Sequence, residues 1–168
     1  MKYFILGFSL FLAFTNHTLL SQSGSNEIPE HGLWPRPEII PIPTGTSDVE
    51  NPVVWLNGTW FINTSPAKEY WNEKIDTIDW KEVIAPSSIE KQGINIERGR
   101  EYAYKKSFLI PEDFKNKRII LRFEGVTGTA KAWINGKFLK EHYGGFTVWT
   151  RDITDFVTPG QEALLTVG

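Results

Sequence analysis

The stretch Lys131-Ala132-Trp133-Ile134-Asn135-Gly136-Lys137-Phe138-Leu139-Lys140 decides the fold. Its central dipeptide, Asn135-Gly136, tolerates the left-handed backbone angles that a two-residue type I′ turn requires. The residues on either side of this dipeptide favour strand conformation. The stretch therefore predicts a β-hairpin, and the neighbouring sequence decides which kind of β-fold contains it.

Short strand-like segments separated by turn residues continue on both sides of the hairpin, with hardly any helical periodicity. Residues 118–124 alternate like a half-buried strand, with Ile119, Leu121 and Phe123 on one side and Arg122 and Glu124 on the other. The other expected strands are residues 53–56 and 59–63 on either side of Asn57-Gly58, 79–84 before the turn at 85–88, 102–108, and 163–167. Eight or so short strands at roughly 8–12-residue spacing predict an all-β fold, an antiparallel β-sandwich or jelly roll.

The composition excludes several classes of partner and site. Hydrophobic residues make up 40% and charged residues 23% of the 168 residues, as in ordinary soluble domains. A net charge of −2 is too small, and of the wrong sign, to indicate nucleic acid or anionic membrane partners. Cysteine is absent, which excludes disulfides and zinc–thiolate sites. The 7 Trp, 5 Tyr and 11 Phe suit the inner faces of a sandwich and also sugar-stacking surfaces.

The N-terminal part divides into two segments. Residues 1–23 predict a signal peptide, because Lys2 precedes the apolar run 3–14 and Ser21-Gln22-Ser23 offers a cleavage site. An exported protein, periplasmic or extracellular and free of the membrane after cleavage, is therefore expected. Residues 24–52 are rich in proline and should lie extended over the domain, with Trp34 or Ile40 as anchors; a disordered linker is the alternative.

The domain itself is expected over residues 53–168. Its last strand, 163–167, stops at Gly168 without a polar cap or closing turn. Because a chain that ends inside an apolar strand would fray there, we expect this domain to be truncated at its C-terminal end.

No local motif predicts a catalytic, cofactor or metal site. His31 and His142 are far apart in the sequence and have no Cys partner for a metal. Ser87-Ser88 lies in a turn without a nucleophile elbow around it. Sugar-cleaving enzymes use a pair of carboxylates, but nothing local singles out two of the many present. The carboxylates considered, all expected to be solvated strand or turn residues, are Glu97, Glu101, Glu124 and Asp152.

Taken in order, a set of short motifs resembles the N-terminal domain of family 2 glycoside hydrolases. The resemblance covers about residues 53–168, and it is the shared order and spacing of the pieces that makes it specific. The matching pieces are Asn57-Gly58-Thr59-Trp60-Phe61, Asp79-Trp80, Ala85-Pro86-Ser87, Tyr104 to Phe108, Leu121-Arg122-Phe123-Glu124-Gly125-Val126, Ala132-Trp133-Ile134-Asn135-Gly136-Lys137, His142-Tyr143-Gly144-Gly145-Phe146, Asp152-Ile153-Thr154, Pro159-Gly160 and Leu164 to Val167.

The resemblance implies a sugar-binding jelly roll, galactose-binding-domain-like, without catalytic residues of its own. In that family an immunoglobulin-like domain and a TIM barrel follow, and two glutamates of the barrel perform retaining hydrolysis of β-galactosides, β-glucuronides or β-mannosides. These domains of the same parent chain, and an oligosaccharide or β-glycoside substrate, are therefore the implied partners, with the acid and nucleophile beyond Gly168.

The resemblance also implies a loop that can reach the sugar pocket, here residues 90–101. Asn95 and Arg98 are its candidates for a polar contact to substrate, although the loop lacks the Tyr-Thr-Asn run of β-galactosidases. Two other functions stay open. One is a free-standing carbohydrate-binding module in which exposed Trp34, Trp71 or Trp149 stacks on sugar rings; the other is a structural or protein-interaction sandwich.

Overall fold

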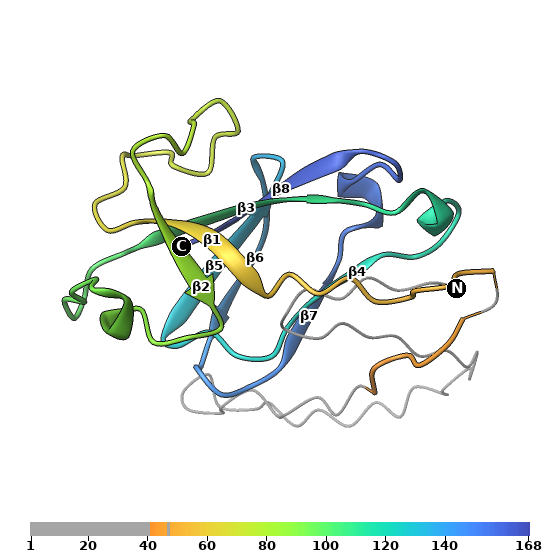
Figure 1. Cartoon of the computed structure of the whole chain (residues 1–168), viewed down its shortest axis with the longest axis horizontal. Helices are drawn as coiled ribbons and strands as arrows, with labels where there is room; N and C mark the ends of the chain where they lie inside the picture. Colours follow the sequence, from red (N-terminus) through yellow and green to blue (C-terminus); the bar gives the residue numbers. More distant parts are fainter. Residues whose placement is uncertain (1–40, 47) are drawn as a thin grey trace, which may run out of the picture.

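The computed structural model describes residues 41–46 and 48–168, and within them the regular structure consists of β-strands and three short 3₁₀ turns (Figure 1). The expected signal peptide, Trp34 and Ile40 lie outside these residues. Within the described part, no helix has the length and apolarity needed to cross a bilayer. Of the proline-rich segment, residues 41–46 and 48–52 are described, and Val49 there is buried in the main core.

Eight strands form two antiparallel sheets. Their bounds are β1 Gly58–Asn63, β2 Lys81–Ala85, β3 Ala103–Leu109, β4 Ile120–Phe123, β5 Thr129–Ile134, β6 Lys137–Tyr143, β7 Trp149–Asp152 and β8 Glu162–Val167. The six-stranded sheet has the order β2-β1-β3-β8-β5-β6, and β4 pairs with β7 in the second sheet. The 3₁₀ turns are η1 Glu90–Gln92, η2 Glu112–Phe114 and η3 Thr154–Phe156. The antiparallel β-sandwich expected from the sequence is confirmed.

The central hairpin is confirmed by strands β5 and β6. Asn135 and Gly136 have φ values of 49° and 74°, the left-handed angles that the turn requires. The Asn135 side chain also receives a hydrogen bond from the backbone N–H of Leu164, 2.9 Å away, which fixes the turn to β8.

The expected strand at residues 53–56 is wrong, because the structure has no strand there. Gly58 does have positive φ, but it begins β1, which pairs with β2 and β3. Leu56 is buried, and its carbonyl accepts a hydrogen bond from the Trp60 indole N–H at 2.8 Å. The chain before β1 therefore enters the core instead of turning back along the strand.

The main core lies between the two sheets. It takes Trp60 and Ile62 from β1, and Phe123 from β4 stacks on Trp149 from β7 with 3.9 Å between ring centroids. The prediction that one side of residues 118–124 faces solvent is wrong. Arg122 is only 6% exposed and its neighbour Ile120 belongs to the core, so both faces of β4 are covered.

The outer face of the large sheet is covered by residues 64–80, which form a third layer without strands. Trp71 stacks on Trp133 of β5, with 5.1 Å between ring centroids and 5° between planes. Beneath this layer Lys105 of β3 is 1% exposed and donates to the carbonyls of Asn72 at 3.1 Å and Ile75 at 2.7 Å. Burial lowers the pKa of this amine. The lysine therefore fastens the covering layer to the sheet.

Candidate functional site

The strand register places several connecting loops at one end of the sandwich. Asn63 pairs with Ala103, Tyr104 with Val167, and Thr129 with Tyr143, so these strand ends share one edge. Segments 64–80, 124–128 and 144–148 lie at this edge, and segment 86–102, which starts at the opposite end of β2, reaches the edge where it enters β3. We call the group of segments the loop end, and it contains the loop in which substrate contacts are expected.

A hollow of about 670 Å³ opens at the loop end, lined by residues 64–71, residues 99–101 and Lys131 of β5. Three side chains meet at one oxygen in its wall. The Tyr70 hydroxyl donates to Oε1 of Glu101 at 2.7 Å, and Nζ of Lys131 donates to the same oxygen at 3.0 Å. Tyr70 is 4% exposed, whereas Glu101 and Lys131 are partly open to solvent. The cluster joins three segments that are far apart in the sequence.

The charges in this cluster are fixed by its geometry. The hydrogen bond from Tyr70 lowers the pKa of Glu101; burial opposes this effect, and the bond and charge of Lys131 add to it. Burial, followed by the bond to Glu101, raises the pKa of Tyr70 far above its usual value. At neutral pH the wall of the hollow therefore contains an ionised carboxylate, a protonated phenol and an ammonium group.

The backbone at Gly168 is packed tightly against this cluster. Its N–H and carbonyl bond the backbone of Lys131 at 2.9 Å and 2.8 Å, which continues the pairing of β8 with β5. A Cβ atom at Gly168 would collide with the Tyr70 hydroxyl. A side chain at this position would therefore require the Tyr70 ring to move.

Asn95 and Arg98 are both exposed, in the loop between η1 and β3. Neither side chain lines the hollow, although the same loop reaches it through Gly99, Arg100 and Glu101. Their contact with substrate stays a prediction. No local pattern in the sequence points to Tyr70 and Lys131 as site residues, because they lie 31 and 30 positions from Glu101 along the chain.

The four carboxylates considered from the sequence are each held by a different cation. The pairs are Glu97–Arg100 at 2.9 Å, Glu101–Lys131 at 3.0 Å, Glu124–Arg122 at 3.1 Å and Asp152–Arg118 at 2.5 Å. Burial works against ionisation of Asp152, but bonds from Thr154 and Arg118 outweigh it and lower its pKa. A general acid requires a raised pKa. Glu101 and Asp152, whose pKa values are lowered, are therefore suited to accepting hydrogen bonds from a ligand more than to donating a proton.

The exposed tryptophans expected for a free-standing carbohydrate-binding module differ in their surroundings. Trp149 is 2% exposed between Phe123 and His142, so the prediction that it is exposed is wrong. Trp71 is half-buried, with its ring against Trp133, and Trp34 lies outside the described residues. His142 is buried and shares a hydrogen bond with the Thr147 hydroxyl at 2.9 Å. Within residues 41–46 and 48–168, no three metal-ligating side chains come together.

Comparison with known proteins agrees with this architecture. Residues 63–168 match the family model described as glycosyl hydrolases family 2, sugar binding domain. A β-galactosidase of Thermoanaerobacter pseudethanolicus is 42% identical over 57 residues, 34% of this chain and 8% of that protein. A β-glucuronidase of Bacteroides fragilis is 30% identical over 112 residues, 65% of this chain and 15% of that protein. A solved β-glucuronidase of Faecalibacterium prausnitzii superposes with a TM-score of 0.58 at 32% identity, covering 67% of this chain and 20% of that one.

The chain thus spans 8% and 15% of the length of these two curated relatives. The part that matches is the strand-rich domain, including β3, the β5–β6 hairpin and the loop end. The family match covers well over half of the chain and agrees with the motifs in the sequence. The chain therefore belongs to glycosyl hydrolase family 2, and residues 63–168 are the domain of that family described as sugar-binding.

Proposed function

We propose that this chain is the N-terminal accessory module of an exported glycoside hydrolase that acts on β-glycosides. The observation that carries the proposal is that the family match lies in the sugar binding domain. The chain covers only 8% and 15% of the length of relatives named as a β-galactosidase and a β-glucuronidase. In this proposal a TIM barrel of the parent protein supplies the catalytic acid and nucleophile. The periplasm or the extracellular space is its site of action, because of the leader-like residues 1–23.

The loop end is the part of the module that we assign to the wall of the parent's sugar pocket. Its hollow contains the ionised Glu101 held by Tyr70 and Lys131, and a fixed carboxylate accepts hydrogen bonds from sugar hydroxyls. Asn95 and Arg98 are exposed on the same loop and can contact a ligand without rearrangement of the core. These features support a binding and positioning role for the module.

The test compares the chain with a version extended by the coding sequence that follows, against aryl β-galactosides, β-glucuronides and β-mannosides. Hydrolysis by the extended protein alone is the expected result, and the glycoside cleaved names the sugar. In the extended protein, Asn95→Ala with Arg98→Ala should raise KM, whereas Lys91→Ala on the nearby exposed η1 should not. Turnover by the 168-residue chain alone would refute the proposal and return attention to its own carboxylates.

A further inference from the structure

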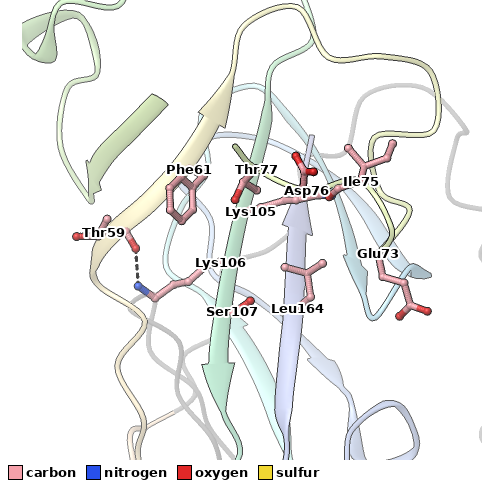
Figure 2. A pocket seen from close by; sticks show the side chains of 10 residues that line it. All are labelled: Thr59, Phe61, Glu73, Ile75, Asp76, Thr77, Lys105, Lys106, Ser107 and Leu164. Carbon is pink, nitrogen blue, oxygen red and sulfur yellow. Dashed lines mark hydrogen bonds between the residues drawn. The ribbon is translucent and has the colours of Figure 1, made fainter. Parts of the chain in front are cut away.

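A second hollow, of about 390 Å³, lies on the outer face of the large sheet, between residues 73–77 of the covering layer and strands β1, β3 and β8 (Figure 2). We call it the trough. Figure 2 shows Phe61 on one flank, Glu73 and Ile75 on the opposite flank, and Lys105, Ser107 and Leu164 between them. Because it crosses three neighbouring strands, the trough is about 10 Å wide.

The trough has an apolar interior with one aromatic ring. Phe61, Leu164 and Ile75 line it and are each only partly covered by the protein. Phe61 points outward because its neighbours Trp60 and Ile62 fill the main core from the other face of β1. An aromatic face beside aliphatic carbon suits the C–H face of a pyranose ring.

The amines at the trough are partly engaged by the protein. Lys105 donates to two backbone carbonyls of the covering layer, and Lys106 donates to the carbonyl of Thr59 at 2.6 Å. An ammonium group has three donors, so a carboxylate or phosphate on a ligand could use only those that remain, and it would also face the carboxylates of Glu73 and Asp76.

The acidic side chains at the trough are still able to accept hydrogen bonds. Oδ1 of Asp76 accepts from the backbone N–H of Ile78 at 3.2 Å, and in the described part of the chain no hydrogen bond engages Oδ2. Glu73 is exposed, and within the described residues no hydrogen bond or ion pair engages its carboxylate. The hydroxyls of Thr77 and Ser107 also line the hollow. This acceptor-rich rim favours a ligand with many hydroxyl donors and no negative charge.

We propose that the trough binds one neutral pyranosyl unit of an oligosaccharide, with Phe61 against its C–H face and Asp76 and Ser107 bonded to its hydroxyls. The trough is distinct from the hollow at the loop end, since the two share no lining residue and Ser107 lies four residues along β3 from Ala103, about 13 Å from that edge. The inference rests on the proposed function, because a parent glycosidase brings oligosaccharide to this domain. It adds a second contact with that oligosaccharide, on the sheet face.

The first measurement is an amide NMR titration of the 168-residue chain with methyl β-D-glucopyranoside, methyl β-D-galactopyranoside and the charged methyl β-D-glucopyranosiduronate. At least one neutral glycoside should shift the amides of Phe61, Ser107 and Leu164, and the uronate should bind more weakly at the same place. Shifts confined to the residues that line the hollow at the loop end, or no saturable shift with either neutral glycoside, would overturn the proposal. Because the map is recorded on the unaltered chain, it does not depend on a variant that folds.

Substitutions then test the aromatic ring of Phe61 and the negative charge of Asp76. Phe61→Ala should weaken binding of the neutral glycoside roughly tenfold, and Phe61→Trp should retain it. Phe138→Ala is the matched control, since Phe138 is 54% exposed and lines neither hollow, and it should leave binding unchanged. Asp76→Asn should reduce the preference for neutral over charged glycoside. Equal binding by the Phe61→Ala and Phe138→Ala variants, with both folded by circular dichroism, would contradict the assignment.

The two proposals fail separately. If the extended protein hydrolyses β-glycosides but no neutral glycoside binds at the trough of the chain, only the proposal for the trough is refuted. Binding at the trough, with an extended protein that cleaves no glycoside, would refute the proposed function and leave the trough standing.

Discussion

Replacing Glu101 by Gln tests whether the Tyr70–Glu101–Lys131 cluster holds the loop end together. A hydrogen bond to a charged group contributes about 1.5–3 kcal/mol and a neutral one about 0.5–1.5 kcal/mol, so exchanging carboxylate for amide should cost about 1 kcal/mol at Tyr70. The Lys131 ion pair is partly solvated and adds about 0.2–1 kcal/mol. Glu101→Gln should therefore lower the free energy of unfolding by about 1–2 kcal/mol, measured by urea denaturation at neutral pH.

Glu97→Gln is the matched control, because it makes the same change in the same loop. The Glu97–Arg100 pair has side chains 65% and 52% exposed, so its loss should change the free energy of unfolding by less than about 0.5 kcal/mol. A double-mutant cycle of Tyr70→Phe with Glu101→Gln should give a coupling of about 1 kcal/mol, since both changes remove one shared bond. Equal effects of Glu101→Gln and Glu97→Gln, together with zero coupling, would refute the structural role of the cluster.

The same cluster gives a pH dependence with a definite sign. The pKa of Glu101 is lowered by folding, so its contribution is present above the unfolded value of about 4.3 and is lost as pH falls through the folded value. The pKa of Tyr70 is raised, so its contribution is present below about 10 and is lost as pH rises beyond that. The stability difference between wild type and Glu101→Gln should therefore shrink in acid. That between wild type and Tyr70→Phe should shrink in alkali.

Two further substitutions have defined outcomes. A Cβ at Gly125 would lie 2.9 Å from the Gly145 carbonyl oxygen. Gly125→Ala should therefore speed hydrogen exchange in residues 144–147 and lower the free energy of unfolding by about 1–3 kcal/mol. Gly45→Ala is the control, because there is open space around Gly45, and it should change neither quantity. Gln92 bonds both the N–H and the carbonyl of Ile84 on edge strand β2, at 2.7 Å and 3.1 Å. Gln92→Ala should therefore increase self-association in light scattering, and an unchanged particle size would contradict this protective role.

The elements that the sequence predicts well are those determined by neighbouring residues. The β5–β6 hairpin follows from the backbone angles of Asn135-Gly136, and strand 79–84 ends, as β2, close to the proline at position 86. Residues 53–56 carry a similar apolar signal and were predicted wrongly. An apolar run beside an Asn-Gly dipeptide does not distinguish a strand from a segment that enters the core, and here the Trp60 indole bond to Leu56 marks the second case.

The third layer could not be predicted, because its contacts are long-range. Residues 64–78 are not part of any helix or strand expected from the sequence, and Lys105, which attaches the layer to the sheet, lies 30 and 33 positions away from its two acceptors. Lysine is rarely fully buried, so a sequence pattern assigns Lys105 to the surface. It is buried here because a covering segment without regular structure leaves backbone carbonyls that need donors, and the amine supplies them.

This layer also connects the two binding surfaces that we propose. Tyr70 of the layer forms part of the hollow at the loop end, and Glu73 to Thr77 of the same layer form one flank of the trough. Lys105 bonds the segment between them, at Asn72 and Ile75. Loosening this one attachment would therefore disturb both hollows together, whereas a change at Asn95 or Arg98 affects the loop end alone. The position of the layer on the sheet, and not the local sequence of either surface, determines the shape of both.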